Sequence, residues 1–521
     1  MAALAPFLHK AFHIDDPLFL WMAQQIAKHP LDPYGFSVNW ASFPEPMWAE
    51  MQNPPLCSYF IAVTASLVGW SERALHCAFL FLATMSILGT SAIARRFCRE
   101  PLVAALLTLF TPVFLVSATN VMCDVMLLAL WVWSIECWLA GLERNRWWLL
   151  VLSALLIAAA TLTKYFGIAL VPLLGVYTLA RNWRSSSRLI VLVIPLAAAA
   201  AYDFWTRSKY GHGLLSAAIF YARDTPMRSS ASAFTQLLSG LCFLGGCLFA
   251  PLFYAPLKRI RPLLCVAVPA AFVAICFYFF VPTSPEWLLG TKTAAIQLEG
   301  AFFAAIGAGI VALVIFDLAR DRSAENLLLA LWLLGTFGFA TFLNWSITAR
   351  TLLPLAPAVA ILLMRSVPPS DRGLLLRYWP IIPAMIMSLL VATADYRHAN
   401  SARQASNVYQ QRFRNENATV WFQSHWGFQY YMQQWGATPL NSLDSELRSG
   451  DVMIIPSNNT AIVQIDESKI FPPQEEFFPV LPFVSVFGRG TGAGFYTSVR
   501  GLVPWSIVET APELYYVARF R

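Results

Sequence analysis

Residues 122–141 read MCDVMLLALWVWSIECWLAG, an apolar stretch long enough to cross a membrane as one helix. The stretch contains two acidic residues, Asp124 near its start and Glu136 in its interior. A carboxylate left in hydrocarbon is costly. We therefore expect Asp124 at the membrane surface and Glu136 paired between helices. Similar apolar runs flank this stretch on both sides, which predicts a mostly α-helical, polytopic membrane protein.

The composition supports this class. Of 521 residues, 58% are hydrophobic and only 12% are charged, about half the charged share of a soluble domain. The formal net charge of +7 is typical of a membrane protein whose Lys and Arg gather in cytoplasmic loops, so it does not indicate a nucleic-acid partner. The 9 Cys form no C-x-x-C pair and no spacing typical of a zinc or redox site.

The apolar runs predict about twelve transmembrane helices after residue 73. They lie at about 74–94, 101–118, 122–141, 147–163, 165–180, 189–206, 234–255, 263–281, 301–317, 326–343, 351–364 and 378–394. The run at 351–364 is short and contains Pro354 and Pro357. Since proline interrupts helices, we expect this run to be broken.

The loops between these runs alternate in charge. Basic clusters such as 95–99, 144–146 and 181–188 alternate along the chain with loops that carry fewer Lys and Arg. By the positive-inside rule the basic loops are cytoplasmic, which places the alternate loops outside. The run at 54–70 begins with two prolines, and on this topology it must lie along the interface or re-enter rather than cross.

Three regions follow from this pattern. Residues 1–73 form a first outer loop with an acidic stretch, HIDDP at 13–17, and a juxtamembrane helix. Asp16 suits a cap position and Pro17 a first helical turn, which predicts a helix at about 17–28. Residues 74–394 form the transmembrane domain. Residues 395–521 are polar and mixed, which predicts a small soluble α/β domain on the outer face.

Several short segments, taken in their order and spacing, resemble one family of membrane enzymes. They are DDPLFLWMA at 15–23, QNPPL at 52–56, VMCDV at 121–125, LTKYFG at 162–167 and, more loosely, ARTLLPLAP at 349–357. Together they resemble the bacterial GT-C glycosyltransferases that use polyprenyl-phosphate sugars. That group includes protein O-mannosyltransferases, the aminoarabinose transferase of lipid A and Rgt-type lipopolysaccharide sugar transferases.

The chain departs from the family pattern at a few points. The acidic pair is Asp-Asp rather than Asp-Glu, Asn53 stands where a basic residue is common, and Tyr165 stands where Gly is common. In the family a membrane span precedes the acidic motif, whereas here a stretch of about a dozen residues does.

The resemblance implies a GT-C-like fold and an inverting sugar transfer at the outer face of a bacterial inner membrane. The partners would be a polyprenyl-phosphate sugar donor, a lipid, glycan or protein hydroxyl acceptor, and membrane lipids. No cofactor is expected to be required, although the acidic residues could bind a divalent cation. The implied roles are general base for Asp15, orientation for Asp16 and Asp124, donor phosphate binding for Lys164, Arg350 and Arg223, and acceptor or juxtamembrane contacts for Asn53 and His425.

Most of these residues also have a plainer interpretation. The Asp pair could be a helix cap beside a solvated acid, and Lys164 and Arg350 could be helix-end cations that snorkel to the interface. His425 could be an ordinary histidine of a folded domain. For the whole chain, the main alternative function is a lipid-linked sugar flippase or transporter, and a structural membrane subunit is a further one.

Overall fold

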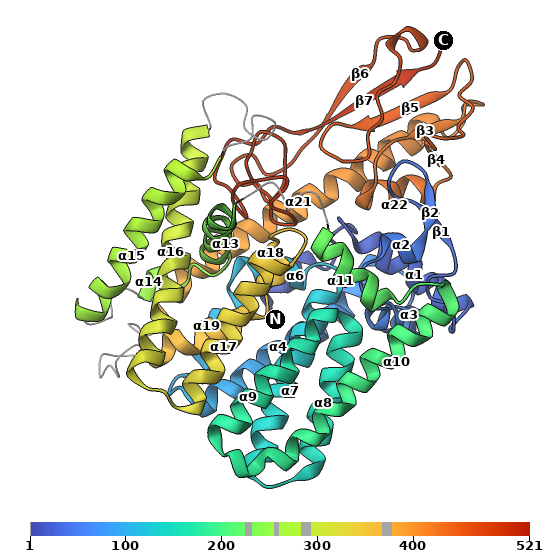
Figure 1. Ribbon diagram of the computed structural model, residues 1–521. Coiled ribbons are helices and arrows are strands. Elements are labelled where there is room, and N and C mark those ends of the chain that lie inside the picture. The colour runs from blue at the N-terminus through green and yellow to red at the C-terminus, as the bar shows by residue number, and fades with distance from the viewer. Residues whose placement is uncertain (1, 225–231, 255–259, 283–292, 367–377) are drawn as a thin grey trace.

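A computed structural model describes residues 2–224, 232–254, 260–282, 293–366 and 378–521. A body of long helices carries a small sheet domain above one of its ends (Figure 1). This arrangement confirms the predicted class, a mostly α polytopic protein with a C-terminal α/β domain.

The N-terminal region, predicted as a first outer loop, consists of short elements. They are the 3-10 helix η1 (Ala2–Phe7), α1 (Asp16–Lys28), strands β1 (Ser37–Asn39) and β2 (Pro44–Pro46), α2 (Met47–Glu50) and α3 (Leu56–Val68). The N-cap residue of α1 is Asp15 rather than the expected Asp16, and its side chain makes no capping hydrogen bond, whereas Pro17 lies in the first turn as predicted. With 13 residues, α3 is about 20 Å long. It is therefore too short to cross a bilayer core of about 30 Å, in agreement with an interfacial or re-entrant helix.

The helical body follows. Its helices are α4 (Glu72–Phe97), α5 (Pro101–Leu109), α6 (Pro112–Ala118), α7 (Cys123–Glu143), α8 (Trp147–Thr163), η2 (Tyr165–Ala169), α9 (Leu170–Arg181), η3 (Trp183–Leu192), α10 (Val193–Tyr210), α11 (Leu214–Asp224), α13 (Ala233–Cys247), α14 (Pro251–Tyr254), α15 (Ile260–Phe280), α16 (Thr293–Arg320), α17 (Ala324–Gly338), the π-helical η6 (Phe339–Leu343), α18 (Ala349–Leu352), α19 (Leu355–Ser366) and α21 (Ile381–Phe413).

Five helical segments among the described residues are long and apolar enough to cross a membrane, and a sixth span results if the bent pair α5 and α6 counts as one. That pair bends by 65° just before Pro112. Most other predicted runs form shorter apolar helices. The predicted break in the run at 351–364 is confirmed, because α18 ends at Leu352 and α19 begins at Leu355.

Polar and small residues join the helices. Arg96 of α4 binds Glu136 of α7 through two hydrogen bonds of 2.8 and 2.6 Å, which confirms that Glu136 is paired between helices. Gly245 and Gly307 let α13 and α16 approach closely. A Cβ at either position would lie 2.0 Å or less from a backbone oxygen of the other helix, a packing typical of membrane helices.

The C-terminal domain holds a five-stranded sheet in the order β4-β3-β5-β7-β6. Its strands are β3 (Val420–Phe422), β4 (Thr438–Pro439), β5 (Val452–Pro456), β6 (Gln474–Phe478) and β7 (Glu513–Arg519), and its remaining helices are α22 (Trp426–Gln434) and the 3-10 helix η7 (Glu467–Lys469). The strand β3 is parallel to β4 and β5, whereas β7 is antiparallel to β5 and β6.

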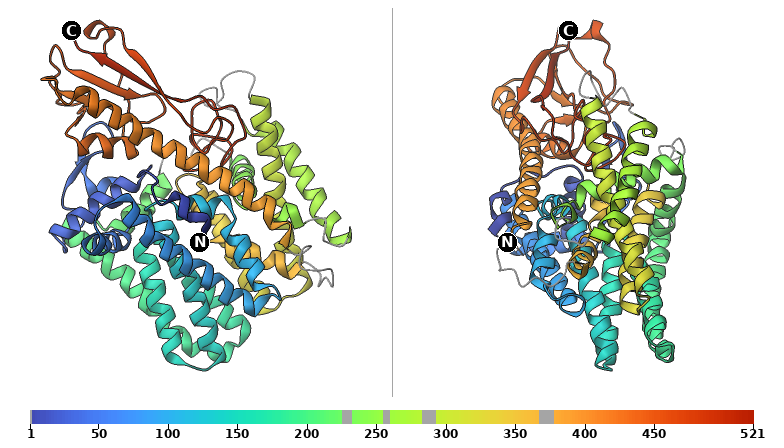
Figure 2. Two further views of the ribbon diagram at one scale, coloured as in Figure 1. Left: turned by 180° about the vertical axis from the view of Figure 1, so that it is seen from behind. Right: turned by 90° about the vertical axis from the view of Figure 1, so that its left-hand side faces the viewer.

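Two features tie this domain to the helical body. The helix α21 runs without a break across residue 394, the expected domain boundary, and extends from the body to the sheet (Figure 2). Residues 484–506, which we call the closing segment, pack irregularly on the helices. In this segment Trp505 donates a 2.7 Å hydrogen bond from its indole nitrogen to the carbonyl of Gly246 in α13. The closing segment therefore belongs to the helical core, although it is part of the C-terminal region in sequence.

Candidate active site

Helix pairing brings the predicted residues to one end of the body. The helices α7 and α8 are joined by a short turn at 144–146. Asp124 starts α7 and Lys164 follows α8, so both lie at the end opposite that turn. The acidic stretch and the short helix α18 reach the same end, because Arg350 of α18 lies near Asp124 and contacts Asp15.

Four charged side chains form a continuous chain, which we call the open cluster. The Nη2 of Arg350 donates a 2.8 Å hydrogen bond to Oδ2 of Asp15. The Nη1 of the same guanidinium lies 3.8 Å from Oδ2 of Asp124. Asp124 in turn accepts a 2.7 Å hydrogen bond from Lys164 at its Oδ1. The sequence prediction that these four residues share one side of the protein is therefore matched by direct contacts.

The open cluster is incompletely enclosed. The Asp15 side chain is 30% exposed, against 4% for Asp124, and Lys164 is 22% exposed. Among the described groups, the buried Nε of Arg350 has no hydrogen-bond partner. A buried donor without a partner is costly, so this guanidinium is suited to bind an additional acceptor such as an anion.

Asp16 differs sharply from its neighbour. It is fully buried, and its two oxygens accept 2.8 Å hydrogen bonds from the backbone amides of His13 and Val121. Burial raises the pKa of Asp16 to about 7, although Lys10 opposes the shift. Asp16 thus fixes the acidic stretch to the loop before α7, and it has no open face toward a substrate.

The residue before the pair is strained. Ile14 has a φ of 46°, a left-handed conformation that is rare for a β-branched residue. Such strain persists only where surrounding contacts impose it, and it is concentrated at functional sites. After this bend the two carboxylates have different partners, since Asp16 accepts hydrogen bonds from backbone amides in the interior whereas Asp15 accepts one from Arg350.

Three other predicted residues have different surroundings. Asn53 is half-buried, and its carbonyl accepts a 2.9 Å hydrogen bond from the hydroxyl of Tyr34. Arg223 belongs to α11, and its side chain lies outside what the structure describes. The Tyr34 contact does not join Asn53 to the open cluster.

His425 is buried against the N-terminal region. Its Nδ1 lies 2.8 Å from the carbonyl of Trp40, its Nε2 lies 2.6 Å from the hydroxyl of Thr460, and its ring stacks on Trp40 at 4.5 Å. Burial lowers the pKa of His425 to about 3. These contacts match the plainer interpretation, a histidine that joins two parts of the fold, and both ring nitrogens are already occupied.

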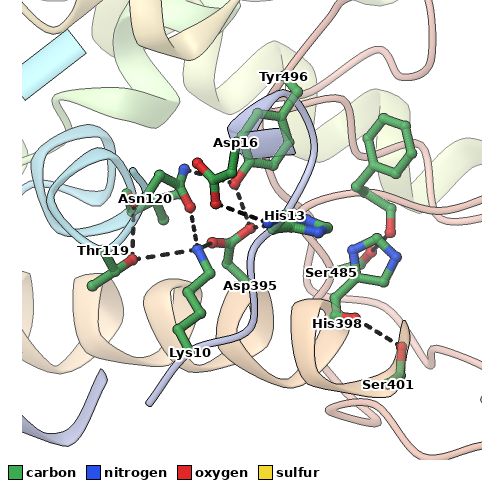
Figure 3. A network of polar contacts seen from close by, with 12 residues as sticks. Lys10, His13, Asp16, Thr119, Asn120, Asp395, His398, Ser401, Ser485 and Tyr496 are labelled. Atoms are coloured by element: carbon green, nitrogen blue, oxygen red, sulfur yellow. Dashed lines mark hydrogen bonds and ion pairs between the residues drawn. The ribbon is translucent and has the colours of Figure 1, made fainter. Parts of the chain in front are cut away.

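A second group of charges lies beside the open cluster, and we call it the sealed network (Figure 3). Lys10 and Asp395 are fully buried and form an ion pair, and Lys10 also donates to Asn120. The hydroxyl of Tyr496 donates a 2.7 Å hydrogen bond to Asp395 and accepts one of 3.1 Å from Asn120. The ring of His13 lies next to Tyr496, at 5.5 Å between centroids.

Sequence analysis did not identify the sealed network. Lys10 stands in a short mixed stretch, and Asp395 directly follows the last apolar run. The position of Asp395 was an available signal, because a carboxylate at the end of an apolar run needs a partner. No local pattern could have identified that partner, which is 385 residues away.

The described residues include no group of three His, Cys, Asp or Glu side chains placed to hold a metal ion. Asp16 and Asp124, two of the three acids considered for a divalent cation, are instead bonded to backbone amides and to Lys164 respectively.

Comparisons with known proteins agree with the sequence resemblance. Residues 52–205 match the family model described as dolichyl-phosphate-mannose-protein mannosyltransferase. No curated protein sequence matches the chain. The match contains the segments around Asn53, Asp124 and Lys164. It confirms the predicted resemblance to GT-C glycosyltransferases and, with the apolar helices, supports the coarse class of a multi-pass membrane glycosyltransferase.

Two solved structures are similar over most of the chain. ArnT from Cupriavidus metallidurans, bound to undecaprenyl phosphate, has 14% sequence identity and a TM-score of 0.46, with 88% of this chain and 92% of that chain covered. The archaeal oligosaccharyltransferase AglB from Archaeoglobus fulgidus, in complex with an inhibitory peptide and a dolichol phosphate, has 13% identity and a TM-score of 0.46, with 86% and 66% covered.

Proposed function

We propose that this protein transfers a sugar from a polyprenyl-phosphate donor to a hydroxyl of a lipid, glycan or protein acceptor. The reaction takes place at the outer face of a bacterial inner membrane. The observation that carries the proposal is the open cluster. It combines an accessible carboxylate with two cations at one end of the helical body, in a chain whose residues 52–205 match a mannosyltransferase family model.

Asp15 is the general base, because among the three acids of the predicted site its carboxylate is the accessible one. The acceptor oxygen attacks the anomeric carbon while Asp15 takes the hydroxyl proton. The bond between that carbon and the phosphate oxygen breaks, the polyprenyl phosphate leaves with the bonding electrons, and the configuration inverts. General-base assistance of this kind is typically worth about 10²–10⁴-fold in rate.

Arg350 and Lys164 bind the donor phosphate. The leaving phosphate gains negative charge in the transition state, and fixed cations placed beside it lower the barrier. Arg350 has a free Nε for this purpose, and Lys164 is partly exposed. A phosphate bound to Arg350 also competes for the guanidinium that now holds Asp15, which leaves the Asp15 carboxylate available to the acceptor.

Mass spectrometry of envelope lipids, lipopolysaccharide and proteins, from cells with and without this protein, tests the proposal. We expect one class of glycoconjugate to lose a single sugar when the protein is absent. The purified protein in proteoliposomes should then restore that sugar when it is supplied with the matching polyprenyl-phosphate donor.

The opposite result identifies the alternative class. If the proteoliposomes move the lipid-linked sugar across the bilayer and form no glycoside with any envelope acceptor, the protein is a transporter and the proposed transfer is wrong.

A further inference from the structure

The closing segment inserts one aromatic residue between the two charge clusters. The ring of Tyr496 lies 5.3 Å from the central guanidinium carbon of Arg350, within the range of a cation–π contact. Its hydroxyl belongs to the sealed network. Tyr496 is therefore in contact with both clusters.

The hydroxyl of Tyr496 is held on two sides. It donates to Asp395 and accepts from Asn120, and Lys10 binds both of these partners. Tyr496, Asp395 and Lys10 are 3% exposed or less. With donor and acceptor positions both used, the ring has a fixed height and orientation.

The fixed ring in turn constrains Arg350. The guanidinium is bonded to Asp15 through Nη2, lies near Asp124 through Nη1, and has the Tyr496 ring in cation–π contact. The short helix α18, which carries Arg350, is itself attached to the closing segment, because the amide of Ala349 donates a 2.9 Å hydrogen bond to the carbonyl of Phe495. Both the side chain and the backbone of this position therefore depend on the closing segment.

We propose that Tyr496 is a positioning residue that aims Arg350 at the donor phosphate, so that a loop of the C-terminal region completes the active site. This role rests on the proposed sugar transfer. Tyr496 does not touch the reacting atoms and acts only through Arg350. The sealed network serves as the rigid support that keeps the ring in place.

Kinetics of purified full-length variants test the role. Tyr496→Leu removes the ring contact, and we expect kcat to fall about ten- to thirtyfold, the rate equivalent of one desolvated cation–π contact. Tyr496→Phe keeps the ring and should lose less. The affinity for undecaprenyl phosphate should weaken in Tyr496→Leu. Tyr516→Leu, a matched change at a half-buried position in β7, should alter neither quantity.

A double variant with Arg350 distinguishes a positioning role of Tyr496 from general support of the fold. In an Arg350→Gln background, Tyr496→Leu should lower kcat less than twofold further, because its target is gone. Multiplicative losses in the double variant, at an unchanged thermal midpoint, overturn the positioning role and leave the transferase intact. A wild-type protein that transfers no sugar from any polyprenyl-phosphate donor overturns the proposed function and this role with it.

Discussion

The open cluster and the sealed network occupy the same end of the helical body, yet their charged side chains differ in exposure and in hydrogen bonding. In the open cluster, Asp15 and Lys164 are 30% and 22% exposed, and Arg350 keeps one donor unused. In the sealed network, Lys10 and Asp395 are fully buried, and Tyr496 uses its hydroxyl as both donor and acceptor.

The difference indicates a reactive role for the open cluster and a structural role for the sealed network. A reacting site needs groups that can exchange partners, and partial exposure and an unused donor provide this. A buried ion pair has no such freedom, because removal of either partner leaves an uncompensated charge. Tyr496 contacts both clusters, because its hydroxyl binds residues of the sealed network and its ring packs on Arg350.

Substitution of Asp15 should give the largest effect on turnover. We expect Asp15→Asn to lower kcat by about 10²–10⁴-fold, because an amide cannot take the acceptor proton. The thermal midpoint of the purified protein should stay nearly constant, since the side chain is partly exposed. Transfer of radiolabelled sugar measures the loss. Retention of more than a tenth of wild-type activity would show that Asp15 is not the base.

Disruption of the sealed network should affect stability instead. Lys10→Met leaves the buried Asp395 carboxylate without its cationic partner, which should lower the free energy of unfolding by about 3–5 kcal/mol. Thermal unfolding in detergent measures the change, and Lys28→Met, at an exposed position near the end of α1, is the matched control.

A double change sharpens this test. Lys10→Met combined with Asp395→Leu removes both buried charges and should recover much of the lost stability, since apolar replacements for a buried ion pair are often neutral. A double variant less stable than Lys10→Met alone would contradict the ion-pair explanation.

Loss of Lys164 should reduce turnover less than loss of the base. We expect Lys164→Met to lower kcat by about 10²-fold, in the range seen when one transition-state donor is removed, with little change in thermal midpoint. Arg146→Met serves as control, because this exposed cation lies at the opposite end of the α7–α8 hairpin. Equal effects of the two changes would remove Lys164 from the site.

Substitution of Asp16 should give the smallest effect, a change in stability that depends on pH. Its pKa is about 7 in the folded protein, against an ordinary value of 3.8. The folded state therefore keeps a proton that the unfolded state loses between about pH 4 and pH 7. Stability from this group is present at low pH and declines as pH rises through that window.

Thermal midpoints of wild type and Asp16→Asn across pH 4–8 measure this contribution. The advantage of the wild type should shrink as pH rises toward 7 and change little above it. A difference that grows with pH would contradict the buried, protonated carboxyl.

The sequence by itself determined the class of the protein and predicted that its candidate site residues share one side. Apolar length and loop charge report the cost of transfer into a bilayer, which is a local property of each segment. For that reason Asp15, Asp124, Lys164 and Arg350 could be assigned to one face, and Glu136 could be expected to have a partner, before any contact was known.

Only the tertiary structure decided which of these residues meet and how. Asp15 and Arg350 are 335 residues apart, and Lys10 and Asp395 are 385 apart. Such pairs depend on how helices pack and on where the closing segment returns to the helical body. Asp15 and Asp16 are adjacent and chemically identical. The same packing leaves the Asp15 carboxylate accessible and buries the Asp16 carboxylate, which supports the structure.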